Sequence, residues 1–155
     1  MYLSCTTCLV ALLAATVAVA EPSEKVHLAR KMLSAFRCVV YAEYAKDPKE
    51  QRRLFELGLS SGREFLSALQ SKEISEELVR KEVPLLGVLL LLSGPSSEFV
   101  IGRIYENASH DAYDEMFKED APGNPLPPAK WVTDAEVQKR IAERQYTAAN
   151  CQLIR

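Results

Sequence analysis

The sequence of 155 residues lacks an excess of charge of either sign, because 21 acidic side chains oppose 19 basic ones and leave a formal net charge of −2. Surfaces that bind nucleic acid carry a basic excess on one face or along one helix. We therefore expect no nucleic-acid partner. Low-complexity tracts are missing too, and apolar residues make up 48% of the chain, so the composition indicates a folded domain.

Several sequence motifs of common catalytic and cofactor sites are also missing. The chain contains no H-E-x-x-H, no glycine-rich phosphate loop and no EF-hand loop. Histidine, the most frequent general base, occurs only twice, as His27 and His110. We therefore predict that the protein uses no cofactor, and we favour a function without enzymatic activity.

The first 20 residues contain no charged side chain, and residues 9–20 form a run of apolar and small residues that ends in Ala18-Val19-Ala20. This layout is typical of a secretory signal peptide with an A-x-A cleavage site. A membrane anchor is the alternative, but the run is too short to cross about 30 Å of hydrocarbon. We predict a signal peptide at 1–20, a single helical domain at 21–155, and a periplasmic or secreted protein without a membrane span.

Removal of the signal peptide leaves two cysteines, Cys38 and Cys151. Two thiols in an exported protein usually pair, so we predict a disulfide between them. Such a bridge closes nearly the whole mature chain, which corresponds to about 4–5 kcal/mol in the loop-entropy model. The alternative is a pair of buried free thiols. A catalytic cysteine is less favoured, because no Cys-x-x-Cys motif remains.

Apolar residues at three- and four-residue spacing predict amphipathic helices. The expected helices cover 23–46, 48–70, a segment from 75 through Pro84, 95–118, and 133 to about 151. Asp47-Pro48 and Thr133 have the residue pattern of helix starts. Residues 85–92 are apolar on every side, so we expect them to be a buried central helix. The predicted fold is all-α, a compact bundle of five or six helices around a central apolar helix, with one disulfide.

Two glycines, Gly58 and Gly62, lie four residues apart on one face of the helix expected at 48–70. Each costs about 1 kcal/mol relative to alanine inside a helix. Close packing against a neighbouring helix is the favoured explanation, and a helix break that lines a cleft is the alternative. Close packing predicts that Gly58→Leu destabilises strongly and that Gly58→Ala is nearly neutral.

The helix expected at 95–118 carries a stripe of mixed aromatic and polar side chains, which is our candidate interaction face: Phe99, Arg103, Glu106, His110 and Tyr113. Glu106, His110 and Asp114 are spaced by four residues, so they share one side of the helix and could bind a metal or act as an acid–base pair. A zinc site would need a further ligand, such as His27. The favoured interpretation is a solvated face on which Arg103 pairs with Glu106.

Four segments resemble those of small exported proteins of uncertain function from proteobacteria and their phages or prophages. These segments are Tyr41-Ala42-Glu43-Tyr44, Leu54-Phe55-Glu56-Leu57-Gly58, Leu89-Leu90-Leu91-Leu92-Ser93-Gly94-Pro95-Ser96 and Gly102-Arg103-Ile104-Tyr105-Glu106. The resemblance covers residues 36–118 and rests on packing motifs. It implies a periplasmic setting and a phage-related origin, and it assigns no functional residues.

Two classes of function follow from these observations. The first is a secreted or periplasmic non-enzymatic binding module whose partner is another envelope or periplasmic protein. Examples are an inhibitor of a wall-degrading enzyme or a protein that excludes a second phage. The alternative is a small hydrolase or metal-binding protein that uses Glu106, His110 and Asp114.

Overall fold

The structure, a computed structural model, describes residues 24–83 and 93–155, which form helices and connecting loops without a strand. The described elements are α1 (Glu24–Tyr44), α2 (Pro48–Gln70), α3 (Glu76–Glu82), α5 (Ser97–Phe117), the 3-10 helix η1 (Pro128–Lys130), α6 (Ala135–Ala148) and the 3-10 helix η2 (Cys151–Leu153). The predicted all-α class is confirmed. The expected signal peptide and the expected central helix at 85–92 lie outside the described residues.

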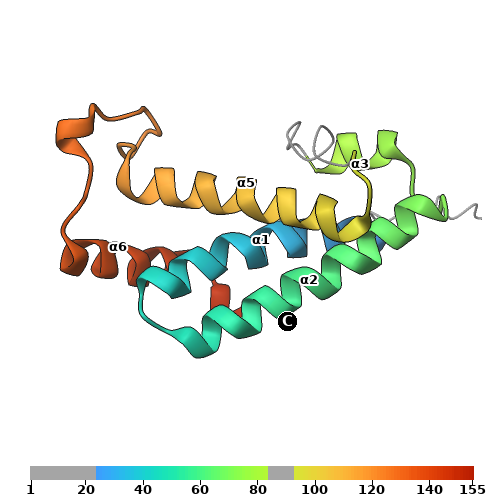
Figure 1. Cartoon of the computed structure of the whole chain (residues 1–155), viewed down its shortest axis with the longest axis horizontal. Helices are drawn as coiled ribbons and strands as arrows, with labels where there is room; N and C mark the ends of the chain where they lie inside the picture. The colour runs from blue at the N-terminus through green and yellow to red at the C-terminus, as the bar shows by residue number, and fades with distance from the viewer. Residues whose placement is uncertain (1–23, 84–92) are drawn as a thin grey trace, which may run out of the picture.

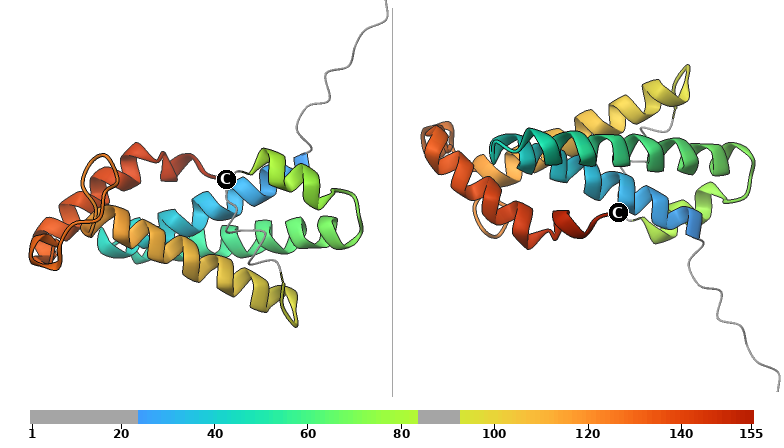
Figure 2. Two further views of the ribbon diagram at one scale, coloured as in Figure 1. Left: turned by 90° about the horizontal axis from the view of Figure 1, so that it is seen from above. Right: turned by 90° about the horizontal axis from the view of Figure 1, so that it is seen from below.

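Helix α1 takes the central place among the described helices (Figure 1). It packs along α2, which runs antiparallel to it, and along α5, which runs in the same direction. Helix α3 lies near the start of α1. Figure 2 shows α6 on the far end of the bundle, where α6 and η2 pack against α1. The buried core of the described residues is therefore built around α1.

Side-chain caps begin four of the described helices. Asp47 accepts a hydrogen bond from the Glu50 amide, as predicted for the start of α2. The prediction for the last helix was wrong by one residue, because Asp134 rather than Thr133 caps α6, by accepting from the Val137 amide at 2.9 Å. The cap is therefore a carboxylate, which also complements the positive end of the helix dipole.

Helix α3 ends earlier than expected. The prediction carried this helix through Pro84, but it ends at Glu82, and Val83 has an extended backbone with ψ 91°. A proline disfavours the helical conformation of the residue before it, because its ring crowds that residue's backbone. The proline thus terminates the helix instead of bending it.

Gly58 and Gly62 are both buried where α2 meets α1, which confirms the predicted close packing. A Cβ atom on Gly58 would lie 2.5 Å from Cδ1 of Phe36, and one on Gly62 would lie 2.8 Å from the sulfur of Met32. The ring of Phe36 is fully buried, and Tyr105 packs against it edge-on with 5.2 Å between ring centroids. We therefore expect Gly58→Ala to destabilise the fold instead of being nearly neutral, because Tyr105 and Phe55 pack against this ring.

Cys38 of α1 and Cys151 of η2 form the predicted disulfide, with their Cα atoms 5.7 Å apart. Both cysteines are almost completely buried. Ala35 and Ala42, which flank Cys38 on α1, are also fully buried, and their small side chains allow the segment after α6 to approach. Among the described helices, none combines the length and the apolar character that a membrane crossing requires.

Candidate functional site

The predicted interaction stripe runs along α5, with Tyr113 half-buried against Tyr44 of α1. We call its five residues the α5 face: Phe99, Arg103, Glu106, His110 and Tyr113. Ile101, Ile104 and Ala108 anchor the opposite side of the helix in the core. Phe99 remains 49% exposed, which is unusual for a large aromatic side chain. Glu106 and His110 are exposed as well, so the stripe is accessible over three turns of the helix.

Arg103 does not pair with Glu106, contrary to the prediction. Its Nη1 donates to the backbone carbonyl of Ser93 at 2.8 Å, and its guanidinium lies 5.8 Å from the centroid of the Phe99 ring. The carbonyl and the ring together hold the guanidinium away from the next turn of the helix. The Glu106 carboxylate consequently forms no ion pair within the described part of the chain.

Glu106, His110 and Asp114 are not gathered into a common site. His110 Nδ1 lies 3.5 Å from Asp114 Oδ2, but the other oxygen of Asp114 pairs with Lys118 Nζ at 2.7 Å. Across residues 24–83 and 93–155, no group of three His, Cys, Asp or Glu side chains could hold a metal ion. His27, the second histidine, lies in the first turn of α1. His110 lies beside the last turns of that helix, because Tyr113 of α5 packs against Tyr44 of α1. At a rise of 1.5 Å per residue, the two histidines are about 20 Å apart.

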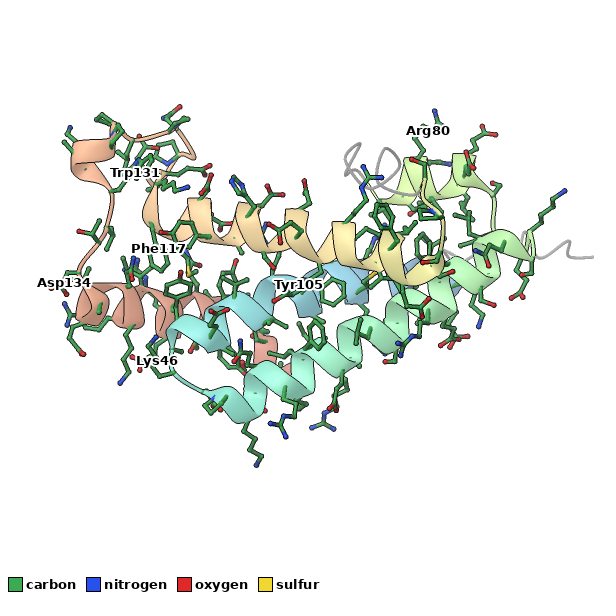
Figure 3. All side chains as sticks on the ribbon, in the orientation of Figure 1. Lys46, Arg80, Tyr105, Phe117, Trp131 and Asp134 are labelled. Carbon is green, nitrogen blue, oxygen red and sulfur yellow. A yellow bond between two sulfur atoms is a disulfide. The ribbon has the colours of Figure 1, made fainter. Side chains whose placement is uncertain are left out.

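Lys118 itself is held between two aromatic rings at the end of α5. Its Nζ lies 4.9 Å from the centroid of Tyr113 and 5.0 Å from that of Trp131. Trp131 belongs to the proline-rich loop that leads to α6, and its indole donates to the Leu126 carbonyl at 2.9 Å (Figure 3). The lysine thus fills this aromatic site and joins the loop to α5.

Two open cavities meet at Tyr105, which projects from α5 into the space between α5 and α2 (Figure 3). One measures about 220 Å³, and its lining includes Glu43, Tyr44, Glu106, His110 and Tyr113. The other measures about 270 Å³, and we call its lining residues the α2 groove: Val39, Pro48, Gln51, Arg52, Phe55 and Tyr105. Tyr105 therefore borders both cavities, and Glu106, His110 and Tyr113 of the α5 face line the first of them.

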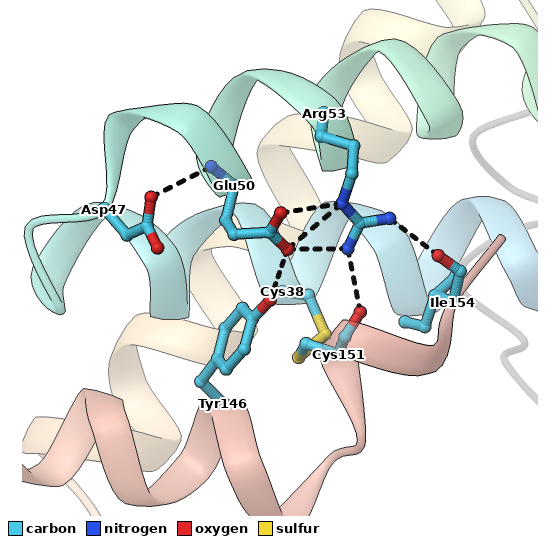
Figure 4. A network of polar contacts seen from close by, with 7 residues as sticks. All are labelled: Cys38, Asp47, Glu50, Arg53, Tyr146, Cys151 and Ile154. Atoms are coloured by element: carbon cyan, nitrogen blue, oxygen red, sulfur yellow. Dashed lines mark hydrogen bonds and ion pairs between the residues drawn. A yellow bond between two sulfur atoms is a disulfide. The ribbon is translucent and has the colours of Figure 1, made fainter.

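A polar network that sequence analysis missed joins α2 to α6 and η2 (Figure 4). Arg53 donates to both carboxylate oxygens of Glu50, at 2.7 to 3.0 Å. The same guanidinium donates to the backbone carbonyls of Ile154 at 2.7 Å and Cys151 at 3.0 Å. Tyr146 donates its hydroxyl hydrogen to Glu50. The pairing of Glu50 with Arg53 at i+3 is readable from sequence, but the other partners are brought together only by the fold.

These contacts shift two pKa values in opposite directions. The pKa of the Glu50 carboxyl lies below its ordinary value, first because Arg53 donates to it and then because Tyr146 does. Burial, followed by the hydrogen bond to Glu50, raises the pKa of Tyr146 to about 12 from its ordinary 10.0. The network is therefore fully formed at neutral pH, where Glu50 is ionised and Tyr146 is protonated.

We predict that Tyr146→Phe lowers the free energy of unfolding by about 1 kcal/mol at pH 7, because one hydrogen bond to a carboxylate is lost. Since folding raises the pKa of this tyrosine, its contribution is complete below pH 10 and is lost as the pH approaches 12. Urea unfolding from pH 7 to pH 12 should show the two proteins converging in stability. A constant difference across this range would contradict the role of the hydroxyl.

Comparison with known proteins adds no assignment. No family model, no curated protein and no solved structure matches the chain. The function is therefore inferred from the surface that the described residues form: the α5 face and the α2 groove.

Proposed function

We propose that the mature chain is a small non-enzymatic binding module of the periplasm or the cell exterior, and that it binds another envelope protein through the α5 face. The observation that carries this proposal is the exposure of Phe99 beside Arg103 on a helix whose other side is anchored in the core. Aromatic and arginine side chains are the residues most enriched at the energetic centres of protein interfaces.

The spacing of the exposed side chains supports a particular mode of binding. Phe99, Arg103, Glu106 and His110 follow one another by four, three and four residues, so they form a ridge along α5. Such a ridge is the pattern by which a helix binds in a groove of its partner. Inhibition of a wall-degrading enzyme, with the ridge bound in a groove of that enzyme, is one role within this proposal. Exclusion of a second phage would use the same ridge on a different envelope protein.

The disulfide supports the proposed location. Bridges of this kind form and persist in oxidising compartments, and they are rare in the cytosol. The bridge is buried and joins α1 to η2, so it serves the stability of the fold. The apolar leader ending in Ala18-Val19-Ala20 and the resemblance to small exported proteins point to the same location.

Phe99→Asp should weaken binding of the partner at least about thirtyfold, because loss of a central aromatic contact typically costs 2 kcal/mol or more. The partner is first captured from periplasmic extract with the mature wild-type chain and identified by mass spectrometry. Its dissociation constants for the wild type and the variants are then measured with purified proteins.

Leu153→Asp is the matched control, because Leu153 is a large apolar side chain that is 63% exposed on η2 and does not belong to the α5 face. It should bind the partner as the wild type does. Equal affinities for Phe99→Asp and the wild type, or a loss with Leu153→Asp alone, would place the interface elsewhere.

A further inference from the structure

The α2 groove adjoins a basic surface. A cavity of about 420 Å³ opens beside it and is lined by Pro48, Lys49, Arg52, Arg53 and Glu56. Pro48 and Arg52 line both this cavity and the α2 groove. Arg52 therefore lies between a pocket lined mostly by charged residues and one lined mostly by uncharged residues.

The positive charge at this border is not neutralised by the described residues. Arg53 is paired with Glu50, but neither Lys49 nor Arg52 forms an ion pair within residues 24–83 and 93–155. Glu56 lies one helical turn after Arg52, yet the two groups form no ion pair. Two free cations thus face one carboxylate, which leaves a positive charge available to a ligand.

The groove beside these cations has an aromatic floor. Phe55 and Tyr105 meet edge to face, with 5.3 Å between ring centroids, and Phe55 also packs against Phe36. Phe55 and Tyr105 are only partly buried, because their outer edges line the groove. This floor can accept one large apolar side chain without a rearrangement of the core.

The charge changes sign beyond Tyr105. The next cavity is lined by Glu43 and Glu106, and neither forms an ion pair with a described residue. A ligand that follows the groove therefore meets cations at one end, aromatic rings in the middle and carboxylates at the other end. Glu106 and His110, which line the acidic cavity, also belong to the α5 face.

We infer that the α2 groove binds an extended segment of the partner protein that is acidic at one end, carries one large apolar side chain in the middle and is basic at the other end. The acidic end pairs with Lys49 and Arg52, the apolar side chain lies on Phe55 and Tyr105, and the basic end faces Glu43 and Glu106. This inference rests on the proposed function and specifies the chemistry of its partner.

A labelled peptide of the sequence Asp-Glu-Gly-Phe-Gly-Lys-Lys tests the inference on the purified mature chain by fluorescence anisotropy. Its control is Asn-Gln-Gly-Phe-Gly-Lys-Lys, which has the same shape without the carboxylates. The acidic peptide should bind at least about tenfold more tightly, and Arg52→Glu should abolish this difference. Arg140→Glu changes an exposed arginine of α6 and should leave it intact.

Several results would overturn the inference. The two peptides binding equally, or neither binding, would do so. The same holds if Arg140→Glu reduces the difference in affinity as much as Arg52→Glu does. Binding of the fatty acid dodecanoate through Arg52, without binding of the peptide, would point to a lipid ligand instead. Arg52 is exposed, so Arg52→Glu should keep the wild-type melting temperature.

Binding of the captured partner to the variants separates the two proposals. If Phe99→Asp weakens its binding and Arg52→Glu does not, the groove inference fails alone, whereas an unchanged affinity for Phe99→Asp removes the proposed function.

Discussion

Replacing Cys38 and Cys151 together by alanine is expected to lower the free energy of unfolding by about 4–5 kcal/mol. The bridge joins residues 113 positions apart, so its loss frees this long loop in the unfolded state. Both sulfur atoms are buried between α1 and η2, so a small cavity adds to the cost. Domains of this size have total stabilities of about 5–15 kcal/mol, and the variant should therefore be marginally stable.

Urea unfolding followed by circular dichroism measures this difference. The variant should remain helical in the absence of denaturant, because the helices are also held by the two apolar clusters of the core. The wild type reduced under denaturing conditions and refolded with reductant provides the control, and it should match the variant. A difference of less than about 1 kcal/mol between variant and wild type would contradict the structural role of the bridge.

Gly58→Leu should destabilise the fold by about 3 kcal/mol, and Gly58→Ala by about 1–2 kcal/mol. Even the Cβ atom of alanine would lie 2.5 Å from Cδ1 of Phe36, and leucine adds three further carbon atoms at the same place. Phe36 cannot turn aside freely, because Phe55 and Tyr105 pack against its ring. Thermal and urea unfolding of the three proteins should give the order wild type, Gly58→Ala, Gly58→Leu from most to least stable.

Gly102→Ala is the matched control for helix propensity. Gly102 lies inside α5, and a Cβ atom there would meet nothing within 4 Å. Alanine at this position should stabilise the protein by up to about 1 kcal/mol, because it favours the helix without crowding a neighbour. If Gly58→Ala also stabilised the protein, close packing of α1 against α2 would be the wrong explanation for the buried glycine.

Local signals in the sequence predicted the parts of the fold that depend on local chemistry. Asp47 followed by Pro48 marks the start of α2, because a capping carboxylate and a proline at the first helical position act within one turn. The disulfide followed from counting cysteines after signal-peptide removal. The cap of α6 was displaced by one residue, because Thr133 and Asp134 both suit that position and only the backbone conformation decides between them.

The candidate site was predictable only in part. Helical spacing placed the α5 face on one stripe, and the structure shows these residues exposed or half-buried there. The α2 groove could not be predicted, because Val39, Arg52 and Tyr105 come from three helices whose packing has no short-range signature. Arg103 was assigned to Glu106 from spacing alone, whereas the Ser93 carbonyl that accepts its hydrogen bond lies ten residues earlier in the chain.

A photo-crosslinking amino acid at position 99 gives the most direct test of binding through the α5 face. It is introduced into the chain in the native host, and position 140 on α6 is used in a parallel strain as the control. Binding through the α5 face predicts that illumination joins one envelope protein to the chain from position 99 and not from position 140. Crosslinks from position 140 alone, or none from position 99, would contradict it.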